Sequence, residues 1–240
     1  TTVITNAARE PEICDLAAFL NRCGAHVSGA GGSTIVVEGV KKLSGCEHRV
    51  IPDRIAAATF MSAAAATGGC IRLNHVLPAH LEPVLPAFEE LGCSMEWDDT
   101  SLRITAPGRL GRIKSVRTMP YPGFPTDAQP PLMAAACLGS GPSIFVETIF
   151  ESRYKHVGEL LRLGANIKVE GRVAVVEGVP RLSGAPVEAA DLRGGAALVV
   201  AGLAARGLTE VTGLRHIDRG YENLERSLAQ LGADICREYE

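Results

Sequence analysis

One pattern recurs four times in this 240-residue sequence: a stretch with helical periodicity ends in a glycine, and strand-forming residues follow. The four glycines are Gly24, Gly92, Gly164 and Gly232. Glycine readily adopts the left-handed conformation that ends a helix. The spacing of about 70 residues exceeds the roughly 20–50 residues of solenoid repeats, so each repeat should be a sizeable α+β module.

Each module is expected to contain strands and a buried helix. Strand-forming runs rich in β-branched residues follow three of the glycines, at residues 34–39, 101–104 and 172–178. Alanine-rich segments that are apolar on nearly every face predict inner, buried helices at residues 55–67, 128–138 and 194–206. Amphipathic segments predict outer helices with one face in solvent at residues 79–91, 156–163 and 220–231.

These elements predict an α/β fold made of α+β repeats, in which three sheets surround three buried parallel helices. Only three inner helices begin after residue 51. We therefore expect residues 1–51 to be the tail unit of a first domain, and residues 52–240 to be a second, nearly complete domain. The chain begins and ends within a unit, which indicates a piece of a longer protein.

Composition excludes several classes of protein. A net charge of −3 and a pI near 6.1 argue against partners such as nucleic acid or a membrane surface. No stretch approaches the roughly 18 apolar residues of a membrane span. The seven cysteines are scattered, without a C-x-x-C or H-x-x-x-H pattern, so we expect no disulfide, no metal site and a cytoplasmic location. His80 and His156 are expected to be surface or packing residues.

A charged residue stands at the start of each inner helix: Arg54, Asp127 and Arg193. Helix N-termini carry partial positive charge, so three parallel helices beginning at one end would create a site that attracts anions. For any single helix, N-capping by an Asp or Thr is the simpler explanation.

Five motifs stand in order along the chain: NAAREPE at 6–12, FPTD at 124–127, ETIFESR at 147–153, DLR at 191–193 and HIDRGYE at 216–222. Together they closely resemble the UDP-N-acetylglucosamine enolpyruvyl transferases, and the match runs along essentially the whole chain. The resemblance implies two inside-out α/β barrel domains, each of three repeated units, with the active site between them.

The reaction that the resemblance implies moves the enolpyruvyl group of phosphoenolpyruvate onto the 3′-hydroxyl of UDP-N-acetylglucosamine. A tetrahedral ketal forms, and phosphate then leaves. This is the first committed step of peptidoglycan synthesis, and it needs no metal or organic cofactor.

The resemblance also assigns residues. Asp127 matches the aspartate that contacts the 3′-hydroxyl and is the proposed general base. Arg193 and Arg219 match arginines that bind phosphoenolpyruvate and its phosphate, and a planar guanidinium suits both anions. Ile149 matches a backbone contact to the sugar nucleotide. The alternatives are a helix-capping role for Asp127 and structural ion pairs for the arginines.

Three further residues are weaker candidates: Arg54, Arg153 and Asp191. The chain departs from the family pattern at Tyr121, where many members have His, at Ser152, which replaces a common Asn, and at Lys155, which replaces a hydrophobic residue.

The family's Lys-Asn pair and its loop Cys or Asp have no match in these 240 residues. We therefore expect this chain alone to hold half an active site and to be inactive. Two alternatives stay open: the shikimate-pathway enolpyruvyl transferase, and a non-catalytic fragment that binds only a ligand or a partner chain. The FPTD and HIDRGYE contexts favour the sugar-nucleotide enzyme.

Overall fold

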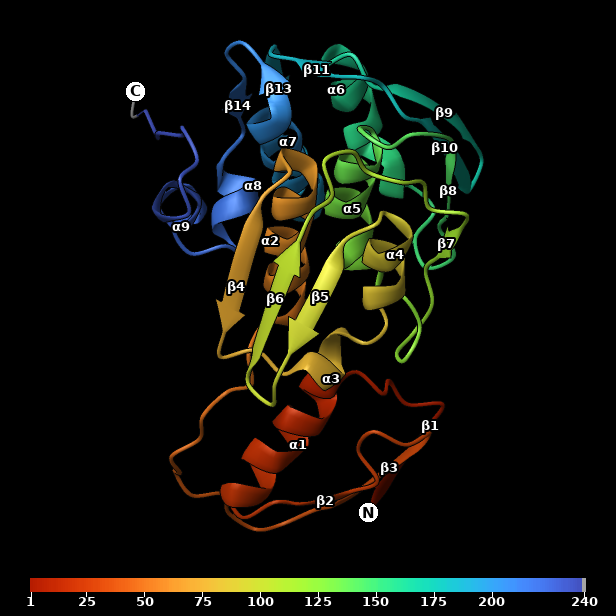
Figure 1. Ribbon diagram of the computed structural model, residues 1–240. Coiled ribbons are helices and arrows are strands. Elements are labelled where there is room, and N and C mark those ends of the chain that lie inside the picture. The colour runs from red at the N-terminus through yellow and green to blue at the C-terminus, as the bar shows by residue number, and fades with distance from the viewer. Residues whose placement is uncertain (239–240) are drawn as a thin grey trace.

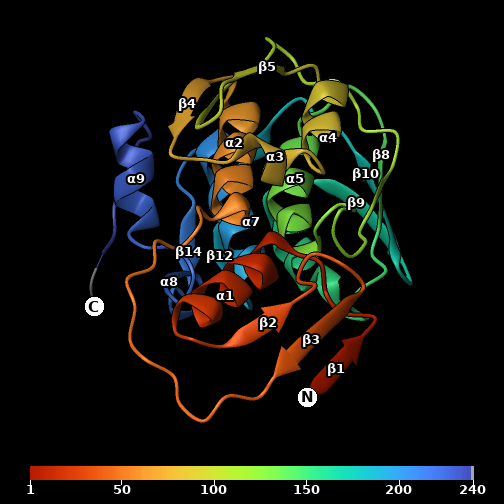
Figure 2. The same cartoon turned by 90° about the horizontal axis from the view of Figure 1, so that it is seen from below.

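Three buried helices form the centre of the molecule. The computed structural model describes residues 1–238, and α2 (Arg54–Thr67), α5 (Gln129–Ala136) and α7 (Leu192–Ala204) pack against one another in it. Figures 1 and 2 show them side by side. Their alanine-rich sequences allow this close approach, and nearly all residues of α5 are buried. The three predicted inner helices are confirmed.

Sheets lie around these helices. One sheet has the order β4–β6–β5, from β4 (Cys70–Asn74), β5 (Ser94–Trp97) and β6 (Ser101–Thr105). A second has the order β7–β8–β10–β9, from β7 (Val116–Arg117), β8 (Ser143–Val146), β9 (Asn166–Glu170) and β10 (Val173–Glu177). Two parallel pairs follow: β11 (Leu182–Ser183) with β13 (Ala205–Arg206), and β12 (Pro186–Glu188) with β14 (Glu210–Thr212). Where a third continuous sheet was expected, the described residues form two short pairs, so the fold is a mixed α/β arrangement without a closed barrel.

The outer helices are shorter than the sequence predicted. The expected helix at 79–91 is two helices, α3 (Pro78–Leu81) and α4 (Leu85–Glu90). Pro83 lies between them, and proline cannot donate a helical backbone hydrogen bond. The expected helix at 220–231 begins only at α9 (Leu224–Gln230), because Asn223 has a φ of 48°. The remaining short helices are η1 (Thr126–Ala128), η2 (Arg153–His156), α6 (Val157–Arg162) and α8 (Arg215–Asp218).

Residues 1–38 form a small unit below the central helices in Figure 1. It consists of α1 (Pro11–Arg22) and a sheet of order β1–β3–β2, from β1 (Thr2–Thr5), β2 (His26–Ser28) and β3 (Thr34–Glu38). Residues 39–53 connect this unit to α2 and lie in neither helix nor strand. Apolar side chains on this part of the chain, among them Val3 and Val50, are exposed.

The internal repeat is confirmed in the backbone. The four repeat glycines have φ angles between 86° and 95°, as the helix-ending role requires. Antiparallel hairpins β2–β3, β5–β6 and β9–β10 follow three of them. In these three units the carbonyl before the glycine, at Cys23, Leu91 or Leu163, accepts a backbone hydrogen bond from the chain that returns after the hairpin.

Within residues 1–238, none of the helices combines the length and apolarity that crossing a bilayer requires.

Candidate functional site

A cavity of about 900 Å³ lies between residues 1–52 and the N-terminal ends of the three central helices. Glu12 and Phe19 of α1 line one side. Arg54, Asp127 and Arg193 line the opposite side, each at the start of a different helix. The charged residues that the sequence placed at three separate helix starts therefore do face one shared space.

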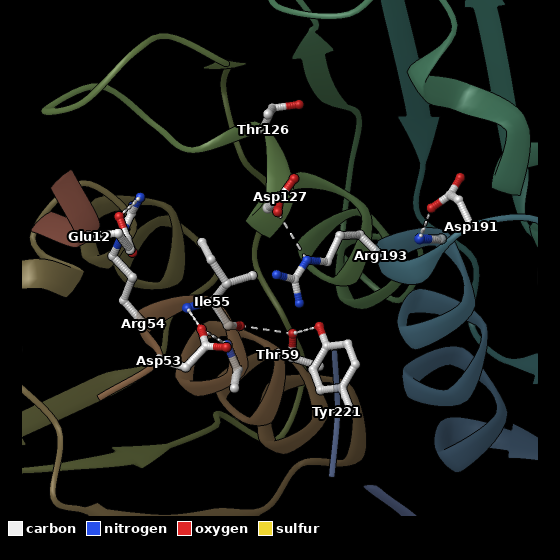
Figure 3. Close-up of polar contacts among 12 residues, drawn as sticks. Glu12, Asp53, Arg54, Ile55, Thr59, Thr126, Asp127, Asp191, Arg193 and Tyr221 are labelled. Carbon is white, nitrogen blue, oxygen red and sulfur yellow. Dashed lines mark hydrogen bonds and ion pairs between the residues drawn. The ribbon is translucent and has the colours of Figure 1, made fainter. Parts of the chain in front are cut away.

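Asp127 lies at the centre of the polar groups in the cavity wall. Its Oδ1 accepts a hydrogen bond from Nη2 of Arg153 at 2.7 Å, and its Oδ2 accepts one from Nε of Arg193 at 3.1 Å (Figure 3 draws the second of these). The two guanidinium groups are largely buried, whereas the carboxylate of Asp127 is 39% exposed. Asp127 lies in the first turn of η1, whose N-cap is Pro125, and its printed hydrogen bonds go to the two arginines. Each carboxylate oxygen keeps a lone pair for a ligand.

Arg193 has hydrogen-bonding capacity left over. Its Cζ lies 5.2 Å from the ring centroid of Tyr221, and its Nε is bound to Asp127. Its Nη1 is buried without a hydrogen-bond partner among the described residues. A guanidinium is well suited to bind an anion, and Arg193 lines the cavity besides forming an ion pair with Asp127.

Arg54 lies at the same cavity but is already engaged. Its Nε and Nη2 donate to the two carboxylate oxygens of Glu12 at 2.8 and 3.3 Å, and its Cζ lies 5.5 Å from the ring centroid of Tyr121. Burial tends to raise the pKa of Glu12, but the hydrogen bond and charge of Arg54 outweigh it, and the net pKa is lowered. In this structure Arg54 is therefore held in an ion pair with Glu12.

Two aspartates cap helices, as the sequence suggested. Asp53 accepts hydrogen bonds from the backbone N–H groups of Ile55 and Ala56 at the start of α2. Asp191 accepts one from Gly194 at the start of α7, at 2.7 Å. Asp191 is absent from the cavity wall, so its role in the structure is to cap the helix that carries Arg193.

Ile149 and Phe150 form another part of the cavity wall, and a buried carboxylate holds their backbone. Oε1 of Glu147 accepts from the backbone N–H groups of Ile149 at 2.7 Å and Phe150 at 3.0 Å. Its two oxygens also accept from the hydroxyl groups of Thr118 and Thr126, each at 2.9 Å. Glu147 is 1% exposed. Glu147 belongs to the motif at 147–153, but its role could not be predicted from the sequence, because only the folded chain shows which groups it binds.

Arg219 is the one strong candidate that the structure leaves outside the described cavity wall. It follows α8 directly, is exposed and does not line the cavity with Asp127.

Of the three departures from the family pattern, Tyr121 lines the cavity, whereas Ser152 and Lys155 are exposed. In residues 1–238, no three His, Cys, Asp or Glu side chains come together in a group that could hold a metal ion.

His156 lies behind the site and is a packing residue, as expected. It is 3% exposed, and neither ring nitrogen has a hydrogen-bond partner among the described residues. Burial lowers the pKa of His156 to about 4, so the ring is neutral at neutral pH.

Comparisons with solved structures define the class of protein. The chain superimposes on an enolpyruvyl transferase, NikO from Streptomyces tendae, with a TM-score of 0.84 and 27% identity, covering 97% of this chain and 56% of that one. An EPSP synthase from Acinetobacter baumannii shares the fold, with a TM-score of 0.67 and 20% identity over 89% of this chain and 52% of that one. The fold is therefore that of the enolpyruvyl transferases.

The family model described as EPSP synthase (3-phosphoshikimate 1-carboxyvinyltransferase) matches residues 1–228, and the chain belongs to this family. Two curated relatives are named UDP-N-acetylglucosamine 1-carboxyvinyltransferase 2. The one from Caldanaerobacter subterraneus subsp. tengcongensis is 52% identical over 98% of this chain and 57% of the relative. The one from Bacillus subtilis is 50% identical over 99% of this chain and 55% of the relative. The resemblance drawn from the five motifs is confirmed. The chain spans about half the length of the curated relatives it matches.

Proposed function

We propose that a full-length protein carrying this chain transfers the enolpyruvyl group from phosphoenolpyruvate to the 3′-hydroxyl of UDP-N-acetylglucosamine and releases phosphate. The observation that supports this most is the position of Asp127, held between Arg153 and Arg193 at the wall of a 900 Å³ cavity. The names of the relatives supply the acceptor. The reaction would serve peptidoglycan synthesis in the cytoplasm and would need no cofactor.

In this proposal the carboxylate of Asp127 accepts a hydrogen bond from the 3′-hydroxyl and takes its proton as the oxygen attacks C2 of phosphoenolpyruvate. The methylene carbon gains a proton in the same addition, which gives a tetrahedral ketal phosphate. Elimination removes a proton from that methyl group and expels phosphate, which restores the double bond. Because Arg153 and Arg193 fix the carboxylate, little of its freedom remains to be lost when the hydroxyl binds.

Arg193 is the proposed ligand of the phosphoenolpyruvate anion, through its guanidinium at the cavity wall. Arg219, after α8, is the proposed second arginine, and α8 packs against α7, which carries Arg193. Ile149 would contact the sugar nucleotide through its backbone carbonyl, since its N–H is bound to Glu147.

We further propose that residues 1–51 are the tail unit of a first domain and residues 52–240 a second domain with the inside-out three-unit arrangement. The cavity then forms where the two meet. The segment that the relatives have in addition would contribute the general acid and a lysine, so the 240-residue chain alone would be inactive.

Phosphate release from phosphoenolpyruvate by a full-length protein carrying this chain tests the proposal. Release with UDP-N-acetylglucosamine, and a product heavier by one enolpyruvyl group, is the expected result, with none from the 240-residue chain alone. Release with shikimate 3-phosphate instead would support the shikimate-pathway alternative. Ligand binding without release for either acceptor would support the non-catalytic one.

A further inference from the structure

The aromatic ring under Arg193 comes from a distant part of the chain. Tyr221 follows α8, whereas Arg193 is the second residue of α7. Tyr221 is 4% exposed, and the Cζ of Arg193 lies 5.2 Å from its ring centroid. A guanidinium at this distance over a tyrosine ring is attracted by the negative face of the ring. Figure 3 shows the side chain of Arg193 between Asp127 and Tyr221.

The hydroxyl of Tyr221 fixes the other end of the ring. It lies 2.7 Å from Oγ1 of Thr59, which also donates to the carbonyl of Ile55 at 3.0 Å (Figure 3). Because the single proton of Thr59 is directed to Ile55, the hydroxyl of Tyr221 is the donor to Thr59. Thr59 is 2% exposed and belongs to α2. The ring of Tyr221 therefore links α2, through Thr59, to the guanidinium of Arg193 at the start of α7.

The backbone before the ring packs closely against a side chain at the start of α7. A Cβ added to Gly220 would lie 2.7 Å from Cδ2 of Leu192, the first residue of α7. The N–H of Tyr221 donates to the carbonyl of Ile217 at 3.0 Å, which ties the residue to α8. The segment at 217–221 is thus packed tightly against the start of α7.

We propose that Tyr221 is a positioning residue for the anion-binding arginine. Asp127 holds the Nε edge of Arg193 and the ring of Tyr221 holds its face, so the guanidinium is kept at a fixed orientation at the cavity wall for an anionic substrate group. The proposal rests on the proposed function for the identity of the anion, phosphoenolpyruvate. The positioning of Arg193 by Tyr221 does not depend on that identity, because any phosphate-bearing ligand would bind the same guanidinium.

The test uses a full-length protein carrying this chain, with four variants. Tyr221→Leu removes the ring face, and Tyr221→Phe keeps the ring but loses the bond to Thr59. Thr59→Val removes the same bond from the other side. Tyr154→Phe is the matched control, because it also deletes a tyrosine hydrogen bond, to the carbonyls of Phe145 and Arg172, away from Arg193.

The affinities for phosphoenolpyruvate, inorganic phosphate and UDP-N-acetylglucosamine are measured by calorimetry, and unfolding is followed separately. We expect Tyr221→Leu to lower the affinities for phosphoenolpyruvate and for inorganic phosphate by about tenfold. The affinity for UDP-N-acetylglucosamine should change by less than about twofold. Tyr221→Phe and Thr59→Val should give equal, smaller losses that do not add in the double variant. Tyr154→Phe should lower stability alone.

Unchanged phosphate affinity in Tyr221→Leu, or equal losses for both kinds of ligand, would overturn the positioning role. If Tyr221→Leu does not fold, the comparison of Tyr221→Phe with Tyr154→Phe decides the question. A wild-type protein that binds phosphate but transfers no enolpyruvyl group would count against the proposed function, and the inorganic-phosphate affinities would still decide the role of Tyr221.

Discussion

Glu12 of α1 and Arg54 of α2 form a two-bond ion pair across the candidate site, with N–O distances of 2.8 and 3.3 Å. Arg54 is 8% exposed, so Glu12 supplies the opposite charge for a largely buried guanidinium. Tyr121 adds a second link, because its N–H donates to Oε1 of Glu10 at 3.3 Å. Together these contacts hold the unit formed by residues 1–38 against the central helices.

Glu12→Gln should therefore loosen this unit. The substitution leaves a buried guanidinium with a neutral partner, and we expect the local opening free energy of α1 to fall by about 1–3 kcal/mol. Hydrogen exchange of the amides of residues 13–22 measures it. Glu38→Gln is the control, because its partner His26 is exposed. Unchanged exchange in α1 would show that the pair does not hold the unit.

Glu147 should affect binding of the sugar nucleotide, since it fixes the backbone of Ile149 and Phe150. Glu147→Ala removes the acceptor of two backbone N–H groups and of two threonine hydroxyls, and we expect a loss of about 2–4 kcal/mol in stability and about tenfold in nucleotide affinity. Glu147→Gln should retain most of both, because its amide oxygen can accept the same two bonds. Glu151→Ala, an exposed neighbour, is the control. Equal nucleotide affinity in wild type and Glu147→Ala would contradict this role.

His156 should make stability depend on pH. Its folded pKa of about 4 lies below the ordinary value of 6.5, so between these values the unfolded chain binds a proton that the folded chain does not. The contribution of the neutral, buried ring to the free energy of unfolding is therefore complete above about pH 6.5 and is lost as pH falls toward 4. From pH 7.5 to 5 we expect the residue to cost about 2 kcal/mol of the free energy of unfolding.

Urea unfolding of wild type and His156→Leu at both pH values measures this contribution. The variant should lose about 2 kcal/mol less than wild type over the same interval, whatever its stability at pH 7.5. His26→Leu, at an exposed position, should behave as wild type does. Identical pH dependence in wild type and His156→Leu would show that the pKa of the ring is the same in the folded and the unfolded protein.

Local sequence patterns predicted the parts of the fold that local physics determines. The alanine-rich runs gave α2, α5 and α7, and the repeat glycines gave the hairpins after them. The prediction of one outer helix at 79–91 was wrong. It rested on the apolar periodicity of the segment, whereas Pro83 divides the segment into two helices. The third sheet divided into two pairs, and strand pairing between distant segments has no local signal.

The site was predictable only in part, for the same reason. Parallel inner helices were enough to bring Asp127 and Arg193 together. The contacts that hold them come from Arg153 and Tyr221 on other elements and are visible only after folding. The same is true of Glu147, which binds Thr126 next to Asp127. Arg219 remains a prediction from resemblance, because it lies outside the described cavity wall.

The turnover of Asp127→Asn tests the central claim most directly. In a full-length protein carrying this chain, single-turnover phosphate release from phosphoenolpyruvate and UDP-N-acetylglucosamine would be compared among wild type, Asp127→Asn and Asp99→Asn, the same change at an exposed position. The account predicts a fall of at least about a hundredfold for Asp127→Asn, with sugar-nucleotide affinity largely kept and Asp99→Asn unchanged. Phosphate release by Asp127→Asn at the wild-type rate would contradict it.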